Sequence, residues 1–173
     1  MNRRCARRRS PRQGGLTTIE LVVALAATGL MLALAVSAVG TYAIRAQVAE
    51  SVALAAPLQY EVAREFRAVG MPPADGRAVG QPAGGRPGGT YLDNIDIIDG
   101  RIELRFGRAA HAAIAGRVLS LTPFETVDRQ VVWLCGNDVP GVGLRPLGFW
   151  GGSRQAVQAP TTIEARYLPR ACR

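Results

Sequence analysis

The sequence predicts an α+β protein in which one long N-terminal helix packs on a small antiparallel sheet. Three observations indicate this fold. An uncharged stretch covers residues 21–44, and an apolar pattern with helical spacing continues from it to residue 69. Residues 70–90 are rich in glycine and proline. Residues 91–173, named the head below, contain the short alternating runs and turn residues that are typical of strands.

Residues 1–15 form a basic, polar leader segment without hydrophobic periodicity. It holds six of the 21 basic residues, whereas all 13 acidic residues lie beyond it. Without this segment 15 arginines face 13 carboxylates, so the net charge falls from +8 to about +2. The basicity that would otherwise indicate a nucleic-acid-binding protein is mostly a property of the leader. Nucleic acid is permitted as a partner but unsupported, and the leader suits the cytoplasmic end of a membrane segment.

Residues 16–44, named the stalk below, form a hydrophobic segment long enough to cross a membrane. The 24 uncharged positions of 21–44 would span about 36 Å as a helix, against about 30 Å for a hydrocarbon core. The sequence AVSA at 35–38 has the small residues of a signal cleavage site, but the apolar run is too long for a secretory signal. We therefore expect the stalk to be retained as a membrane anchor.

Glu20 stands at the beginning of this apolar run, and no other charge follows before Arg45. Placing a charge near hydrocarbon costs on the order of several kcal/mol. Glu20 is either an acid favoured by the positive end of the helix dipole or a residue with a functional partner.

Residues 45–69 continue as an amphipathic helix. Their apolar residues recur at spacings of three and four, which places them on one helical face. Pro57 lacks a backbone donor and should kink the helix or mark a join in it. The predicted face consists of Val48, Val52, Ala55, Leu58, Val62, Phe66 and Val69.

Residues 70–90 contain seven glycines and four prolines, a composition that excludes a helix or a central strand. We expect a surface loop that either packs on the head or is mobile. The head begins with the runs 91–98 and 101–106 around Asp99-Gly100, a strong hairpin signal. Ile102, Leu104 and Phe106 alternate with polar residues, so this hairpin should bury one face.

Further strands are expected at 118–122 and 131–135, with one more near Thr161–Tyr167. Cys135 and Cys172 remain as a pair once the leader, which carries Cys5, is removed. An even pair in an exported domain suits a disulfide, with two unlinked thiols as the alternative.

The chain offers little material for an active site. His111 is the only histidine, and no phosphate-binding loop, nucleophile motif or metal-ligand cluster is present in the sequence. We expect no enzyme activity, cofactor or metal.

Together these features resemble the type IV pilins. The leader with Gly15, an apolar residue and Glu20 is similar to a class III leader, in which the acid is the fifth mature residue. IRAQVAE at 44–50, WLCG at 133–136 and YLPRAC at 167–172 are similar to further pilin segments.

The resemblance implies cleavage between Gly15 and Leu16 by a prepilin peptidase, N-methylation of Leu16, and a disulfide between Cys135 and Cys172. It also implies that the Leu16 amine pairs with Glu20 of a neighbouring subunit. The expected partners are other pilin subunits, the peptidase, the inner membrane and its pilus assembly platform. The expected product is an extracellular filament for adhesion, twitching motility or DNA uptake.

Ser37 occupies the place where major pilins usually carry a proline, and Val39 stands where a tyrosine is usual. A minor pilin that primes or tips the filament is therefore a competing interpretation. A pseudopilin of a type II secretion system and a secreted binding domain with a cleaved signal are the others.

Overall fold

A computed structural model of the chain describes residues 15–82, 84–151 and 153–172, without the side chains of residues 36–38. Residues 1–14 of the expected leader lie outside these ranges. The chain divides after Ala38 into two compact units, the second of which is Val39–Arg173. The helix and the sheet that follow confirm the predicted α+β class.

Helix α1 spans Thr18–Val69, a length of 52 residues. It ends because Gly70 takes a positive φ of 79°, and the Gly70 N–H donates to the Phe66 carbonyl at 2.8 Å. No join occurs at Pro57, which lies inside the helix. Pro57 and Ala53, whose carbonyl loses its usual donor, are both exposed, so water can satisfy that carbonyl.

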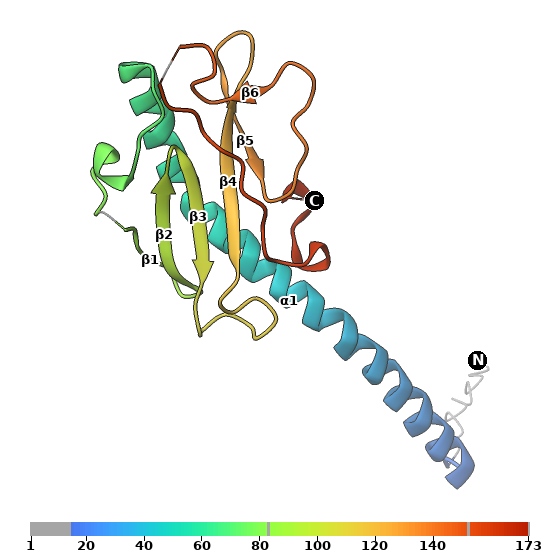
Figure 1. Ribbon diagram of the computed structural model, residues 1–173. Helices are drawn as coiled ribbons and strands as arrows, with labels where there is room; N and C mark the ends of the chain where they lie inside the picture. The colour runs from blue at the N-terminus through green and yellow to red at the C-terminus, as the bar shows by residue number, and fades with distance from the viewer. Residues whose placement is uncertain (1–14, 83, 152, 173) are drawn as a thin grey trace, which may run out of the picture. The chain divides into compact units, whose positions relative to one another are not determined.

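Six antiparallel strands form one sheet, with the order β1-β2-β3-β4-β5 and with β6 paired to β4 (Figure 1). Their bounds are Arg86–Gly88 (β1), Leu92–Ile98 (β2), Arg101–Phe106 (β3), Val118–Glu125 (β4), Val131–Cys135 (β5) and Arg145–Pro146 (β6).

The hairpin between β2 and β3 is the predicted one. Ile98 pairs with Arg101, and the two loop residues Asp99 and Gly100 have φ values of 49° and 81°. Two positive φ values in a two-residue loop match the turn that suits the right-handed twist of strands.

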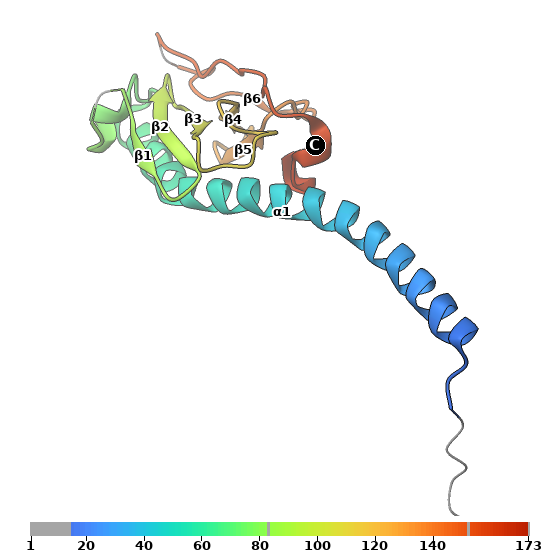
Figure 2. The ribbon, with the colours of Figure 1, turned by 90° about the horizontal axis from the view of Figure 1, so that it is seen from below.

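The core lies between the sheet and the C-terminal half of α1, which runs along one side of the sheet (Figure 2). The β3 residues Ile102, Leu104 and Phe106 are 0% exposed, which confirms their predicted face. The buried apolar residues of the helix are Ile44, Val48, Ala55, Leu58, Val62 and Phe66. Val69 is 53% exposed, because it is the last residue of the helix and the buried face stops at Phe66.

Strand β4 is longer than predicted and is buried on both faces. It runs through Pro123, whose carbonyl accepts a hydrogen bond from the Leu147 N–H at 3.1 Å. One face meets the helical core, and the C-terminal segment passes over the other (Figures 1 and 2). This cover explains why Ser120 and Thr122 are buried.

Two segments differ from simple loops. The 70–90 region packs on the head: it contains the 3-10 helix η1 (Gly76–Val79) and the edge strand β1, and Asp75 forms a β-bridge with Ile98. The strand expected near Thr161–Tyr167 is absent from the described residues. Instead the 3-10 helix η2 covers Ala165–Tyr167, and the segment before it meets β4 at Thr162, whose N–H donates to the Val118 carbonyl at 2.9 Å.

Truncating a side chain of the buried face should show how much the core contributes to the free energy of unfolding. Phe106→Ala should lower the free energy of unfolding by about 3–5 kcal/mol, because it removes a fully buried ring and leaves a cavity. Denaturant unfolding of the full chain in detergent measures this change. The neighbouring Arg105→Ala, an exposed position, should stay within about 0.5 kcal/mol. Equal effects of both variants would contradict the assigned core.

Candidate functional site

The start of α1 places Thr17 directly before the helix. Its carbonyl accepts the Leu21 N–H at 3.1 Å, and its hydroxyl accepts the Glu20 N–H at 3.4 Å. Thr17 therefore caps the helix, and Glu20 lies in the first turn, where the helix dipole favours an acid. The Thr-x-x-Glu spacing of 17–20 is a capping signature that the sequence analysis missed.

Glu20 has no ion-pair or hydrogen-bond partner for its carboxylate among the residues that the structure describes. The side chain is exposed, and Leu16, 75% exposed, precedes the helix. Both interpretations of Glu20 remain compatible with this geometry: the acid suits the helix end, and its carboxylate is available to a group from outside the chain.

The stalk presents an apolar surface on all sides. Every residue from 16 to 35 is exposed, including leucines and valines that would be buried in a typical core. By length and composition α1 can cross a membrane. Thr28 does not disturb this surface, because its hydroxyl donates to the Ala24 carbonyl at 2.7 Å. Residue 37 is helical, and its side chain lies outside the described set.

The expected disulfide joins Cys135 and Cys172, with a Cα–Cα distance of 4.7 Å. Cys135 ends β5, and Cys172 ends the 3-10 helix η3 (Arg170–Cys172). Both cysteines are buried in the core. The bond fixes the C-terminal end of the chain to the sheet.

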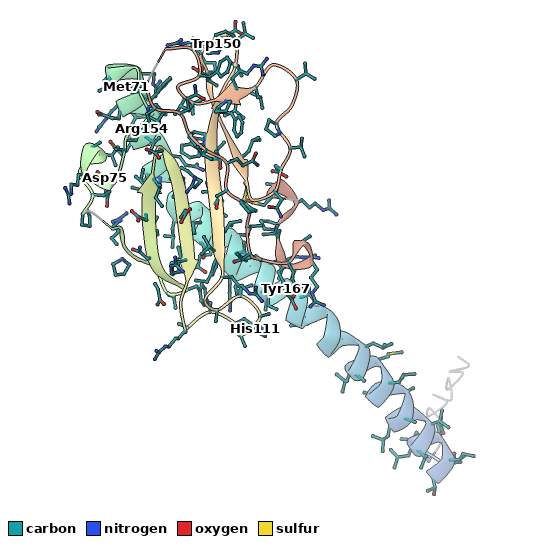
Figure 3. All side chains as sticks on the ribbon, in the orientation of Figure 1. Met71, Asp75, His111, Trp150, Arg154 and Tyr167 are labelled. Atoms are coloured by element: carbon teal, nitrogen blue, oxygen red, sulfur yellow. A yellow bond between two sulfur atoms is a disulfide. The ribbon has the colours of Figure 1, made fainter. Side chains whose placement is uncertain are left out.

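Three arginines attach segments to the head through main-chain carbonyls. Arg45 Nε of α1 donates to the Arg166 carbonyl at 2.8 Å, and Arg101 Nη1 of β3 donates to the Val157 carbonyl at 2.5 Å. Arg154 Nη1 donates to the Pro72 carbonyl at 3.1 Å, while its Nε lies 3.2 Å from Asp99 Oδ1. Figure 3 shows Arg154 near Met71, at the start of the 70–90 region.

His111 is exposed and lies directly before a turn. Its N–H donates to Gln47 Oε1 of α1 at 2.9 Å, and its Nδ1 accepts the Ala113 N–H at 3.1 Å. Within the described ranges no group of three or more His, Cys, Asp or Glu side chains could hold a metal ion.

The aromatic residues divide into two environments. Trp133 is half-buried and packs against the core, whereas Phe149 and Trp150 are exposed. Their rings meet edge to face with centroids 5.1 Å apart. Phe149 and Trp150 therefore form part of the surface.

The first half of α1 is apolar on all sides, and the same helix continues into a disulfide-bonded sheet domain. These features define a subunit whose stalk must be covered by lipid or by other stalks. The chain belongs to the pilin family: the family model described as Pilin (bacterial filament) matches residues 44–173. Pilins are structural proteins of bacterial filaments, so this chain is a filament subunit.

The chain is similar to named pilins along most of its length. It is 28% identical over 167 residues to the type IV major pilin protein PilE of Neisseria gonorrhoeae, covering 93% of this chain and 94% of that protein. It is 27% identical over 167 residues to a fimbrial protein of Neisseria meningitidis, with the same coverage. It is 28% identical over 173 residues to the type IV major fimbrial protein FimA of Dichelobacter nodosus, covering 92% and 94%.

Removing the disulfide should destabilise the head. Cys135→Ser together with Cys172→Ser should lower the free energy of unfolding by about 3–4 kcal/mol, because the bond closes a sequence separation of 37 residues. Denaturant unfolding with and without a reducing agent measures the loss. The reductant should lower the unfolding midpoint of the native protein and leave the midpoint of the double variant unchanged. An unchanged midpoint for the native protein under reductant would contradict this role.

Proposed function

We propose that this chain is the precursor of a type IV pilus subunit that builds the body of the filament. The observation that carries the proposal is the apolar surface of residues 16–35, all of which are exposed, with the carboxylate of Glu20 unpaired among the described residues near its beginning. The relatives are named as major pilins or fimbrial proteins. Those names favour the main subunit over a minor pilin, a pseudopilin or a secreted binding domain.

The stalk is suited to two successive environments. Its apolar surface is stable in the inner membrane before assembly and among the stalks of other subunits afterwards. The leader holds the N-terminal end on the cytoplasmic side. A prepilin peptidase then cuts between Gly15 and Leu16 and methylates Leu16, which leaves the whole stalk on the mature protein.

Glu20 sets the register of neighbouring subunits in this mechanism. Cleavage creates an amine at Leu16, and a neighbouring Glu20 can pair with it inside the filament. A subunit in the wrong register would bury its carboxylate unpaired, at a cost of about 3–5 kcal/mol. The pair therefore selects the correct register more than it adds cohesion.

Assembly requires partners besides other subunits. An open head-to-tail arrangement of identical subunits produces a fibre instead of a closed ring. We assign extension to an assembly platform in the inner membrane and its motors, and we assign this chain no catalysis. The filament would serve adhesion, twitching motility or DNA uptake.

The mature N-terminus distinguishes a pilin from a secreted domain. Mass spectrometry of the protein purified from sheared filaments should find N-methyl-Leu16 as the first residue. A protein that begins at Val39, after the AVSA stretch, would refute the pilin precursor and support a cleaved secretory signal.

The register role of Glu20 is tested by substitution. Glu20→Ala should leave cleavage at Gly15 intact but reduce assembled filament at least about tenfold, because a partner amine stays buried and unpaired. Quantifying the subunit in sheared filaments and in membranes separates assembly from processing. Glu50→Ala is the matched control, since Glu50 is another exposed carboxylate of α1. Normal filament abundance in Glu20→Ala would contradict the proposed role of Glu20 in setting the register.

A further inference from the structure

The turn between β4 and β5 holds an arginine in a conformation that favours glycine. Arg129 has a φ of 62°, and its N–H donates to the Thr126 carbonyl at 2.9 Å. The turn closes through the Thr126 N–H, which donates to the Gln130 carbonyl at 3.0 Å. Glycine would adopt this conformation without strain, so the turn itself gives no reason for an arginine. The side chain of Arg129 is therefore the feature that needs an explanation.

A buried carboxylate orients Arg129 together with a neighbouring aromatic residue. Glu125, at the end of β4, is 0% exposed, and its Oε2 lies 3.8 Å from Arg129 Nε. Its Oε1 accepts the Trp150 N–H at 3.4 Å. Yet the Arg129 side chain is 56% exposed and Trp150 is 51% exposed. Glu125 thus contacts the guanidinium of Arg129 and the backbone N–H of Trp150, two residues that both reach the surface.

Arg129 separates two hollows of the surface. The first, of about 150 Å³, is lined by Arg67, Gln130 and neighbouring residues of α1 and β5. The second, of about 260 Å³, is lined by Val127 and Trp150. One hollow is thus polar and flanked by two arginines, and the other is apolar with an aromatic wall. We name the pair the Arg129 recess.

Two arginines, Arg67 and Arg129, line the polar hollow. Arg67 Nε donates to the Ala63 carbonyl at 3.1 Å, and Arg129 Nε faces Glu125. In the part of the chain that the structure describes, the terminal nitrogens of both guanidinium groups have no partner. Asp128 of the same turn is the one exposed acid next to Arg129 in sequence. Paired terminal N–H groups of arginine match the two oxygens of a carboxylate.

We propose that the Arg129 recess binds a carboxylate carried on a ring, of the size of an acidic monosaccharide. The carboxylate lies between Arg129 and Arg67, and an apolar face of the ring lies on Trp150 and Val127. An inorganic anion would use only the polar hollow, and a neutral sugar would leave both arginines unpaired. Binding at this surface adds an activity to the filament-building role. Repetition along a filament would raise the avidity of a weak single site.

The binding experiment uses the full mature chain in detergent micelles. Isothermal titration with glucuronate, glucose and inorganic phosphate should show glucuronate binding at least ten times more tightly than either of the others. Equal affinity for glucuronate and phosphate would refute the ring contact. Equal affinity for glucuronate and glucose would refute the arginine pair.

Two variants and one matched control locate the site. Arg129→Gly suits the φ of this position but removes the cation beside the buried Glu125, and it should bind glucuronate at least ten times more weakly. Trp150→Ala should weaken the binding of glucuronate but not that of phosphate. Arg166→Ala is the control, since Arg166 is another exposed arginine near an aromatic residue: it lies over the ring of Tyr167, with a distance of 4.8 Å to the centroid. Figure 3 shows Tyr167 and Trp150 at opposite ends of the head.

Filament assembly provides a separate readout. Arg129→Gly should form filaments at normal abundance. The filament-subunit proposal is tested separately, by the filament abundance of Glu20→Ala. Unchanged glucuronate affinity in Arg129→Gly would overturn the ligand site. A loss of filaments in Arg129→Gly would overturn it as well, because the arginine would then serve a contact between subunits.

Discussion

The whole described head depends on one dry contact between the C-terminal half of α1 and the middle of the sheet. Val48 and Val62 of the helix and Ile102, Leu104 and Phe106 of β3 are all 0% exposed. Burying apolar surface is the main favourable term in folding, and at this contact both the helix and the sheet bury theirs. The same helix carries the stalk, so a single element serves the fold at one end and is apolar on all sides at the other.

The sequence predicted those parts of the fold that local periodicity encodes. Spacings of three and four along 45–69 identified the buried helical face, and alternation along 101–106 identified the buried strand face. Asp99-Gly100 identified the hairpin, because few residue pairs adopt two positive φ values. The Gly15, Leu16 and Glu20 pattern defined a candidate assembly site from sequence alone, and it lies in the part of the chain where little tertiary contact is involved.

The parts that sequence could not predict depend on contacts between distant residues. Nothing local indicates that Arg45 would meet the Arg166 carbonyl, 121 positions later, or that the C-terminal segment would cover β4 and extend its burial. The missing strand near Thr161–Tyr167 has the same origin, since the contact of this segment with β4 is a tertiary property. The Arg129 recess combines a turn, a buried carboxylate and Trp150, and only the unusual φ of Arg129 distinguishes it from an ordinary surface turn.

The attachment of the C-terminal segment has a consequence for how this protein can evolve. Its anchors are arginines that donate to the main-chain carbonyls of Arg166 and Val157, and a disulfide at its end. Every residue type supplies a carbonyl, so a replacement at Val157 or Arg166 leaves the anchor in place. The side chains at these two positions can therefore change while the scaffold beneath them persists. The donors do not share that freedom, because losing the guanidinium of Arg45 or Arg101 releases a whole length of chain.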